Sequence, residues 1–598
     1  MHVLSIHTGH GATVGLLKDG KVIACTSEER FKRQKNFMGW PELALAWVLE
    51  YANITMNDIA LVVFPSTDPA SHHMQMYNKA PFMEGNKPIS RKNFRGRMGD
   101  VAKRRLINNS LLWRNYKMMQ NMKNGIKKGK FEERIRADYA RRLCIGKERI
   151  VFVDHHYAHA ITTAFNLPKD RNTLVFTLDG EGDELCATVN IFDGKNMRRI
   201  SATHKDHSLG WLYMHTTRFL GMKGNEHEFK VMGLAPYAKG NYVDKVYERL
   251  KNIVYLDSKD GLAFKSKFPL QFSDTYFDDH FKGTRFDNLA GGVQKLTEDL
   301  MTQWVRQGIE QTGIGDIAIS GGVFMNVKAN MCIAQMPEVH SIFVMPSCGD
   351  ESLVFGGLWH GYEIAAKQQN AAWNPQPITN LYLGKEWTND DIKEYIQREG
   401  IDKRYNVRHF AEIEEKVAEL LAKGEVVARF NGRAEWGARA LGNRSILANP
   451  SNFETVRVIN EMIKNRDFWM PFTPSILDTD MKRYVLNPKN IFAPYMCITF
   501  ESTKLAREHL AAAMHPYDKT LRPQDVREAW NPSYYKIIRA FKKRTGIGAV
   551  LNTSFNLHGE PNVNSPADAI HTMDNSDLRN LAMGNYLIQK QPRSRQGN

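Results

Sequence analysis

Three short apolar runs at the start of the chain are separated by polar, glycine-containing turns. The runs cover residues 3–6, 12–17 and 22–25, with turns at 8–11 and 18–21 between them. The second turn contains Asp-Gly, a strong local signal for a β-hairpin. Because short apolar runs bounded by such turns are typical of buried strands, the pattern predicts three neighbouring β-strands.

A second copy of this plan occurs later in the chain. Apolar residues 173–178 lead into the turn Asp-Gly-Glu-Gly at 179–182, which is followed by an apolar run at 186–192 and a turn at 193–194. Two hairpins with Gly/Asp-rich first turns favour a duplicated actin-like ATPase fold, in which the two turns face a nucleotide and their backbone N–H groups meet its phosphates. The same spacing also permits unrelated β-structure.

Two histidines, His155 and His159, follow a short apolar strand at 149–153. They lie four residues apart in Asp-His-His-Tyr-Ala-His-Ala, so on a helix both imidazoles share one face and are able to grip one metal ion. A strand-to-helix junction is also where α/β proteins place ligands. Histidine pairs at this spacing occur as well on ordinary solvated helix faces, so the pair needs further ligands to become a metal site.

Two aspartates in other turns supply such ligands. Asp179 lies in the turn of the second hairpin, and Asp350 ends the segment 344–350 before an apolar, glycine-rich helix at 353–358. With His155 and His159 they complete a predicted group of two histidines and two aspartates. Its nitrogen and oxygen atoms suit Fe(II), Mn or Zn better than a soft metal.

A further glycine turn follows the predicted strand 316–320. It reads Gly321-Gly322-Val-Phe-Met-Asn326. Glycines at such a turn let the backbone approach a nucleotide more closely than a side chain would permit. The turn is therefore a predicted nucleotide contact.

The chain changes character after an Asn-, Pro- and Gln-rich stretch at 371–380, which is typical of a linker. A helix is predicted at 412–423, and strands at 425–430 and 548–551. This part also gathers cations and neutral donors: Arg433, Arg439, Arg444, Lys464, Arg466 and Asn552-Thr-Ser554-Phe-Asn556. Arg and Lys beside Ser and Asn are what a small dianion such as a phosphate ester requires. Pairing with surface carboxylates explains one or two of these cations, but not their concentration.

Length and composition limit the class of protein. A chain of 598 residues is too long for one core, so we expect at least two domains. Its six cysteines are scattered without a CxxC pair, which favours neither a disulfide framework nor a thiolate zinc site. The sequence contains no signal peptide and no apolar run long enough to span a bilayer. We therefore expect a cytoplasmic protein that makes no membrane contact.

The net charge of +16 is concentrated in one segment. Residues 87–149 contain twenty Lys and Arg against five Asp and Glu, with aromatic residues between the cations. One interpretation is a solvated helical insertion, including one at an oligomer contact such as a homodimer. The other is a surface that attracts phosphates of a nucleotide or a nucleic acid. Basic charge alone does not choose between them.

Eight different short motifs follow one another in order over nearly the whole chain. They are 28–35 (EERFKRQK), 155–160 (HHYAHA), 179–182 (DGEG), 228–237 (EFKVMGLAPY), 320–326 (SGGVFMN), 346–350 (PSCGD), 437–447 (GARALGNRSIL), and 552–556 (NTSFN) with 559–561 (GEP). Together they resemble the O-carbamoyltransferases of antibiotic and nodulation-factor biosynthesis, the family of nebramycin 5′ synthase and the nodulation carbamoyltransferase.

The resemblance implies a fold of mixed α/β and α+β class in two parts. Residues 1–370 would form a duplicated actin-like domain of the threonylcarbamoyl-transfer type, carrying the basic insertion at 87–149. After the linker 371–380, residues 381–598 would form a YrdC-like domain, because Lys464-Asn-Arg466 and Ser554-Phe-Asn556 match its KxR and SxN motifs. The chain departs from the family pattern at four positions, most of which bear on the acceptor site: Gly11, Ala438, Met470 and Ser352.

The resemblance also implies a two-step reaction. The C-terminal part would cleave carbamoyl phosphate and join the carbamate to ATP with Mg, giving carbamoyladenylate. Sequestration matters here because carbamate decomposes in water. The residues expected to hold phosphate and orient the carbamoyl group are Arg439, Arg444, Lys464, Arg466, Ser554 and Asn556.

Transfer to a hydroxylated acceptor would follow in the N-terminal part. There a divalent metal, expected to be Fe(II) with Mn or Zn as alternatives, would be held by His155, His159, Asp179 and Asp350 and polarise the carbonyl. The residues expected to contact the nucleotide are Lys35, Lys230, Gly321, Gly322 and Asn326. His10 would take the proton of the acceptor hydroxyl. A turn histidine that only hydrogen-bonds locally is the competing interpretation.

Other functions share these features. A tRNA-modifying enzyme of the threonylcarbamoyl type is the alternative that both folds and the basic segment permit. It is weakened because the motifs at 228–237 and 437–447 resemble those of the small-molecule carbamoyltransferases. A maturation protein for metal cofactors would carry additional N-terminal regions that the sequence lacks, and a non-enzymatic nucleotide-binding scaffold leaves the C-terminal cations unexplained. The acceptor stays open among natural products, sugars and hydroxymethylated nucleotides, with a nucleic-acid acceptor suggested only by residues 87–149.

Overall fold

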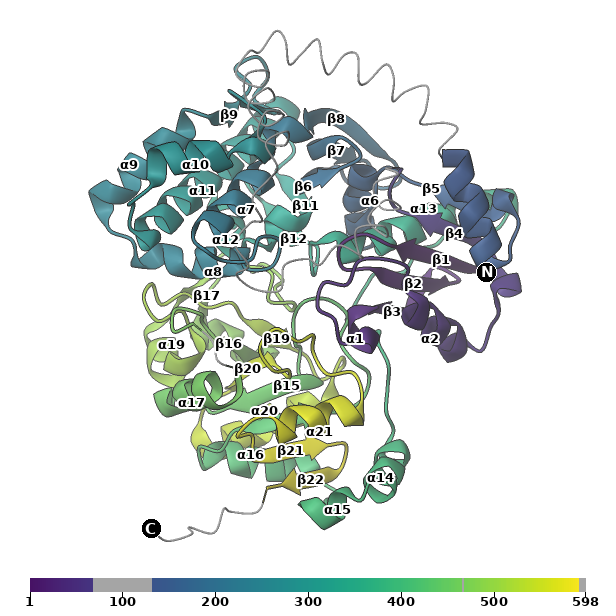
Figure 1. The fold of residues 1–598 in the computed structure, drawn as a ribbon, viewed down its shortest axis with the longest axis vertical. Helices are drawn as coiled ribbons and strands as arrows, with labels where there is room; N and C mark the ends of the chain where they lie inside the picture. The colour runs from purple at the N-terminus through teal and green to yellow at the C-terminus, as the bar shows by residue number, and fades with distance from the viewer. Residues whose placement is uncertain (68–131, 465–466, 591–598) are drawn as a thin grey trace, which may run out of the picture.

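The structure is a computed structural model that describes residues 1–67, 132–464 and 467–590 (Figure 1). Most of the basic insertion predicted at 87–149 therefore lies outside the described residues, and so do Arg466 and the side chain of Lys464. The described end of the insertion, at 132–143, is helical.

The N-terminal strands form a five-stranded sheet in the order β3-β2-β1-β4-β5. The strands are β1 (His2–His7), β2 (Thr13–Lys18), β3 (Lys21–Ser27), β4 (Ile59–Phe64) and β5 (Ile150–Phe152). The first three are antiparallel neighbours, as the turns at 8–11 and 18–21 predict, whereas β1, β4 and β5 run parallel. Asp19 and Gly20 both have positive φ in the second turn, which is the geometry that Asp-Gly favours.

The second sheet repeats this topology. Its order is β12-β11-β6-β7-β8, with the strands β6 (Thr173–Gly182), β7 (Leu185–Phe192), β8 (Met197–His204), β11 (Asp316–Ser320) and β12 (Ser341–Val344). Again the first three strands are antiparallel and the remaining pairs parallel. The duplication predicted from the two hairpins is confirmed.

One helix from each repeat packs against the sheet of the other. Helix α6 (His155–Thr162) follows β5 of the first sheet but packs against β6 and β7 of the second. Helix α13 (Leu353–Gln368) follows β12 of the second sheet but packs against β1 and β4 of the first. The two helices touch each other where they cross, so the first turn of each lies between the two sheets.

Glycine makes this crossing close. A Cβ atom on Gly356 of α13 would stand 2.2 Å from the carbonyl oxygen of Ala158 in α6. A Cβ atom on Gly357 would stand 2.2 Å from the hydroxyl of Ser5 in β1. No other residue type lets these backbones approach so closely.

The described residues of the N-terminal part also form the helices α1 (Glu29–Lys32), α2 (Glu42–Ala52), α7 (Leu209–Phe219), α8 (Glu228–Leu234), α9 (Gly240–Lys251), α10 (Asp274–Phe281), α11 (Phe286–Thr312) and α12 (Val327–Gln335). The long helix α11 packs against α9, α8 and α12 on one side of the second sheet (Figure 1). More than half of the side chains along α11 are buried.

The C-terminal part contains a mixed sheet of eight strands, in the order β13-β22-β21-β14-β15-β20-β16-β19. The strands are β13 (Asn406–His409), β14 (Val427–Phe430), β15 (Arg444–Ala448), β16 (Thr473–Leu477), β19 (Gln524–Val526), β20 (Ala549–Ser554), β21 (Asn580–Met583) and β22 (Tyr586–Gln589). Its longer helices are α14 (Asn389–Arg398), α16 (Ile413–Ala422), α17 (Phe453–Ile459), α20 (Pro532–Thr545) and α21 (Pro566–Asp574). Helix α16 and strands β14 and β20 lie where the sequence predicts them. The mixed α/β class is confirmed.

One of three hydrophobic clusters extends across both parts, and the other two lie within one part each. Phe355 of α13 packs its ring against Trp436, with the ring centroids 4.5 Å apart, and both side chains are buried. The segment 371–380 has no helix or strand and lies along the N-terminal part, where Gln376 N–H donates to the carbonyl of Gly20. Among the described residues, no helix is long and apolar enough to cross a membrane.

The crossing of α6 and α13 gives a first prediction. Replacing Gly356 by alanine should destabilise the protein by about 1–3 kcal/mol, because the added methyl group overpacks a rigid contact. Denaturant unfolding measures this change. Gly233→Ala is the matched control, since a Cβ atom in α8 would meet its nearest neighbour only at 3.4 Å. Equal stability of the two variants would contradict the close crossing.

Candidate functional site

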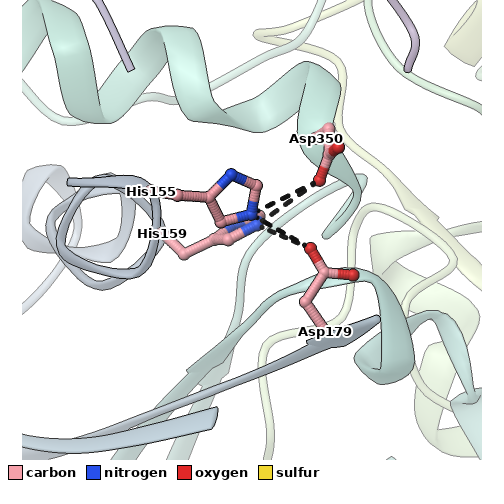
Figure 2. A group of neighbouring side chains, drawn as sticks. All are labelled: His155, His159, Asp179 and Asp350. Atoms are coloured by element: carbon pink, nitrogen blue, oxygen red, sulfur yellow. Dashed lines mark hydrogen bonds and ion pairs between the residues drawn. The ribbon is translucent and has the colours of Figure 1, made fainter. Parts of the chain in front are cut away.

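Four side chains converge between the two repeats (Figure 2). His155 and His159 point their Nε2 atoms from the first turns of α6 to one place, Asp179 enters from β6, and Asp350 enters just before α13. Each Nε2 atom lies 3.2 Å from Oδ2 of Asp179 and 3.7 Å from Oδ1 of Asp350. The structure thus brings together the four residues that the sequence predicts as metal ligands.

The spacing of these atoms fits a coordination sphere. Metal–nitrogen and metal–oxygen bonds of about 2.0–2.2 Å place neighbouring ligand atoms about 3 Å or slightly more apart. One ligand atom from each residue lies within 4.8 Å of all the others, and both histidines are buried. The four side chains therefore converge closely enough that small side-chain movements would bring all four onto one ion.

The electrostatics of the group call for positive charge. Burial lowers the pKa of His155, but its hydrogen bond to Asp179 and the charge of Asp350 outweigh this and raise the pKa to about 9. Burial raises the pKa of Asp179, but the hydrogen bonds from His155 and His159 bring it well below its usual value. Two carboxylates confined beside buried imidazoles are stabilised by a divalent cation in the same way.

Two aspartates outside the ligand set hold α6 in place. Asp154 caps the helix through a hydrogen bond from the backbone N–H of Tyr157. Asp183 accepts a hydrogen bond of 2.8 Å from the backbone N–H of His155, and it also binds the hydroxyl of Ser66 and the N–H of Thr67. The sequence does not mark Asp183, and its position directly after the turn 179–182 is the only signal. It links the first ligand to the end of β4.

The glycine turn after β11 closes against Asp179. Gly321 has a φ of +106°, and a Cβ atom there would stand 2.4 Å from the carbonyl oxygen of Leu178. A Cβ atom on Gly322 would stand 2.7 Å from Oδ1 of Asp179. In this structure both glycines serve the approach of the turn to β6, and their predicted contact with a nucleotide stays a prediction.

The first hairpin turn reaches the same region. His10 lies in the turn between β1 and β2, and among the described residues its imidazole has no hydrogen-bond partner. Burial raises the pKa of Glu351, and the proximity of His10 opposes that rise. His7, at the end of β1, lies closer still to the ligands, with Nε2 3.9 Å from Oδ2 of Asp350. The sequence pattern assigns nothing to His7, which lies between the predicted strand 3–6 and the predicted turn 8–11.

A short chain of contacts joins this group to the C-terminal part. Ser347, just before Asp350, donates its hydroxyl to Glu351 and accepts the backbone N–H of Ala438 at 2.9 Å. Gly437 has a φ of +96°, and a Cβ atom there would stand 2.8 Å from Cβ of Ser347. Arg30 of α1 donates to the carbonyl of Gly437 at 2.9 Å. The loop that carries Arg439 is therefore fixed to the loop that carries Asp350.

Arg439 is a cation without a counter-ion. Among the described residues its guanidinium has neither a hydrogen bond nor an ion pair. Burial lowers its pKa, and the nearby thiols of Cys497 and Cys348 and the carboxyl of Glu351 oppose this. Arg522 also lies near Cys497 and, with Arg439, opposes the burial-driven rise in the pKa of that thiol. The sequence motifs single out Arg439 but not Arg522.

Arg444 lies five residues further in the same motif but has a different environment. Its side chain is fully buried, and it donates to the backbone carbonyls of Asn431, Gly432, Asn443 and Lys385. Burial lowers its pKa to about 9. Because its terminal nitrogens are engaged by carbonyls, the geometry favours a role in shaping the loop over a direct contact with phosphate.

The predicted SxN pair is assembled at the end of β20. The hydroxyl of Ser554 donates to Oδ1 of Asn556 at 2.6 Å, and the amide of Asn556 donates to the carbonyls of Leu557 and Glu560. This loop is fixed from the N-terminal part, because Arg33 binds the carbonyls of Pro561 and Asn562.

Three other predicted nucleotide contacts are engaged within the protein. Lys35 pairs with Glu226 at 3.6 Å, and Lys230 pairs with Asp467 at 2.9 Å. Asn326 caps α12 and exchanges two amide hydrogen bonds with Gln294. Lys464 ends the π-helix Asn460–Lys464, with its side chain outside the described residues, as is the whole of Arg466. The roles of these residues stay predictions.

Two family models match the chain. The model described as "Carbamoyltransferase N-terminus" covers residues 2–357, and the model described as "Carbamoyltransferase C-terminus" covers residues 418–590. The first model spans both repeated sheets and the four converging side chains. The second spans most of the C-terminal sheet.

Named relatives agree with these models. The nodulation protein NolNO of Sinorhizobium fredii is 29% identical over 595 residues, covering 98% of this chain and 80% of that protein. The nodulation protein NolO of Bradyrhizobium diazoefficiens is 30% identical, covering 74% of this chain and 80% of that protein. The 3′-hydroxymethylcephem-O-carbamoyltransferase of Amycolatopsis lactamdurans is 28% identical, covering 49% of this chain and 53% of that protein.

The converging group gives a second prediction. Replacing Asp179 by asparagine should lower the amount of bound metal at least about tenfold, because changes around a metal site typically cost 10–100-fold in affinity. Elemental analysis of the purified protein, loaded separately with Fe(II), Mn(II) and Zn(II), measures the loss. Asp193→Asn, in the exposed turn after β7, is the control and should bind metal like the unaltered protein. Unchanged metal content in Asp179→Asn would contradict the site.

Proposed function

The chain belongs to the carbamoyltransferase family, and from this premise we propose that it makes carbamoyladenylate and transfers the carbamoyl group to a hydroxyl of a small molecule. The observation that carries the proposal is that a hydrogen bond connects the loop next to the candidate metal ligands with the loop that carries Arg439. A group of side chains suited to hold a metal lies on one side of the hydrogen bond between Ser347 and Ala438. On the other side lies the guanidinium of Arg439, which has no partner among the described residues.

In the proposed first step the C-terminal part acts as a YrdC-like domain. Water hydrolyses carbamoyl phosphate to carbamate and phosphate, and a carbamate oxygen then attacks the α-phosphorus of ATP while pyrophosphate leaves. Arg439, a partly buried cation without a partner among the described residues, is suited to hold a phosphate group as charge develops on it. Arg522, close by at Cys497, adds positive charge to the same place.

The remaining C-terminal residues have supporting tasks in this proposal. Ser554 and Asn556 orient the planar carbamoyl group, and their own hydrogen bond sets the direction of both side chains. Arg444 keeps the loop of Arg439 in shape through its bonds to backbone carbonyls. Lys464 and Arg466 are proposed as further phosphate contacts on the strength of the KxR motif alone.

In the proposed second step the oxygen of the acceptor hydroxyl attacks the carbamoyl carbon, and AMP leaves. A metal ion held by His155, His159, Asp179 and Asp350 would supply a Lewis acid at this place. His10 takes the hydroxyl proton. It lies in the turn between β1 and β2, where a Cβ atom on the next residue, Gly11, would stand 3.6 Å from Cβ of Glu351, and its imidazole is not engaged by another described side chain. The residues proposed to contact the nucleotide are Lys35, Lys230, Gly321, Gly322 and Asn326.

Two connected reaction sites suit the proposed chemistry, because its intermediates are unstable in water. Carbamate and its adenylate are short-lived in water, so a reaction that uses both gains from forming and consuming them inside one protein. The contacts of Arg30 and Arg33 with the C-terminal loops hold the two parts in a fixed relation. A fixed relation serves the transfer of an unstable intermediate better than free domain movement.

Arg439 gives a third prediction. Replacing it by glutamine should reduce pyrophosphate release from ATP and carbamoyl phosphate by about 10²–10³-fold, as expected when a charge that stabilises a transition state is removed. Release is measured without threonine and without an acceptor. Arg539→Gln, on the exposed face of α20, should retain the rate. If the unaltered protein releases pyrophosphate only when threonine is added, the proposed function is wrong and the chain is an enzyme of the threonylcarbamoyl type.

His10 gives a fourth prediction. His10→Asn should abolish transfer to the acceptor while leaving carbamoyladenylate formation intact, because only the second step needs a base at this position. Mass spectrometry follows carbamoyladenylate and the carbamoylated product in the same reaction. Loss of both species in the variant would contradict the assignment and favour a structural role for this turn.

A further inference from the structure

One of the two candidate metal-binding histidines has its second ring nitrogen inside the protein. His159 points Nε2 toward Asp179 and Asp350, which leaves Nδ1 for a different partner (Figure 2). The side chain of His159 is fully buried. A histidine that binds a metal through Nε2 carries its proton on Nδ1, and that proton needs an acceptor.

Ser320 provides an acceptor at this nitrogen. It is the last residue of β11, it is fully buried, and its hydroxyl oxygen lies 3.4 Å from Nδ1 of His159. Among the described residues, Nδ1 of His159 has no other hydrogen-bond partner. None of the steps assigned above uses Ser320.

Thr162, the last residue of α6, completes a closed set of hydrogen bonds. Its hydroxyl donates to the backbone carbonyl of His159 at 2.8 Å, and its oxygen lies 3.3 Å from the hydroxyl oxygen of Ser320. Thr162 is also fully buried. The contacts therefore run from the imidazole to Ser320, from Ser320 to Thr162, and from Thr162 back to the backbone of His159.

The number of protons fixes the direction of these hydrogen bonds. A hydroxyl group has one proton to donate, and a carbonyl has none. Because Thr162 donates its proton to the carbonyl of His159, its oxygen accepts in the contact with Ser320. Ser320 then donates its proton to Thr162 and accepts from Nδ1. In neutral His159 the proton therefore lies on Nδ1, and Nε2 keeps its lone pair.

The end of β11 also contacts the segments of other candidate ligands. The backbone N–H of Gly321 donates to the carbonyl of Cys348 at 3.1 Å, in the loop before α13. A Cβ atom on Gly322 would stand 2.7 Å from Oδ1 of Asp179. Together with Ser320, these residues link one strand end to the segments that carry three of the four candidate ligands.

We propose that Ser320 is a positioning residue of the metal site, which together with Thr162 holds the proton of His159 on Nδ1 and keeps Nε2 free for a divalent ion. This inference rests on the metal site of the proposed function. Partners of this kind fix the orientation of a ligating imidazole and raise the basicity of its other nitrogen. An imidazole protonated on Nε2 has to move that proton before it binds the ion.

The second candidate histidine is held in a different way. The backbone N–H of His155 donates to Asp183 at 2.8 Å, and a Cβ atom on Gly182 would stand 2.2 Å from the ring of His155. Among the described residues, no hydroxyl group bonds to Nδ1 of His155. We therefore expect the loss of the Ser320 hydroxyl to weaken one ligand and to leave the other three in place.

Three variants test the assignment. Ser320→Ala removes the acceptor of the Nδ1 proton. Thr162→Val does not alter the partner of the imidazole, but it removes the acceptor of the Ser320 proton, so Ser320 is free to donate to Nδ1 and the imidazole proton moves to Nε2. Thr162→Ser keeps the hydroxyl. The control is Ser5→Ala, in β1, because that hydroxyl is buried and has no partner among the described residues.

The first measurement is the affinity of the metal-free protein for Zn(II), by competition with a chelator. We expect Ser320→Ala and Thr162→Val to raise the Kd by about 10–100-fold, the range typical of losing a partner behind a metal ligand. Thr162→Ser and Ser5→Ala should bind like the unaltered protein, because both keep the hydrogen bonds around His159.

The second measurement is proton NMR of the protein loaded with Co(II). The ring N–H of a histidine bound to this paramagnetic ion gives a strongly shifted signal that disappears in heavy water. We expect one such signal in the unaltered protein to be lost, or to exchange faster with solvent, in Ser320→Ala. A purely structural role of Ser320 would leave this signal unchanged.

The outcomes separate this assignment from the proposed function. If the unaltered protein binds neither Zn(II) nor Co(II), the metal site is wrong and the role of Ser320 is wrong with it. If the protein binds metal but Ser320→Ala and Thr162→Val match Ser5→Ala in affinity and in NMR signals, only the role of Ser320 and Thr162 is wrong. If the expected differences appear but the metal-loaded protein forms no carbamoyladenylate, the role of Ser320 is supported and the proposed function is wrong.

Discussion

The close crossing of α6 and α13 is the constraint on which the site depends. Each helix leaves one sheet and packs on the other, and Gly356 lets them touch through their backbones. The exchange places the first turn of α6, the start of α13 and the end of β6 around one point. Without it, His155 and His159 would face one sheet while Asp350 remained with the other. A side chain at Gly356 would widen this point, and the four ligand atoms would move apart.

The junction between the two parts carries a comparable constraint. Its contacts are specific polar bonds as well as shared apolar packing: Ser347 holds Ala438, Arg30 holds Gly437, and Arg33 holds the loop at 561–562. Several of these residues come from the motifs that resemble the carbamoyltransferases. In this structure Arg30 and Arg33 of the segment 28–35 bind backbone carbonyls of the C-terminal part and so align two loops.

Burial divides residues that the sequence treats alike. Arg439 and Arg444 belong to one motif, yet the first is unpaired among the described residues and the second is enclosed by carbonyls. A guanidinium enclosed in this way stabilises a loop, whereas an unpaired one is available to an anion. His7 and His10 likewise differ in their surroundings. His10 lies in the turn and has no hydrogen-bond partner among the described residues, whereas His7 is buried at the end of β1 with Nε2 3.9 Å from Oδ2 of Asp350.

The sequence by itself determined those features of the protein that depend on interactions between residues close together in the chain. Alternating turns and apolar runs predicted the two hairpins, and the four-residue spacing placed His155 and His159 on one helix face, because both patterns depend only on backbone geometry. The sequence also named Asp179 and Asp350, although it had no means to show that they meet. That meeting, the hydrogen bond of Asp183 to α6 and the burial of His7 near Asp350 depend on which sheet each helix packs against. Only the tertiary structure decided this, because packing is settled by contacts between residues far apart in the chain.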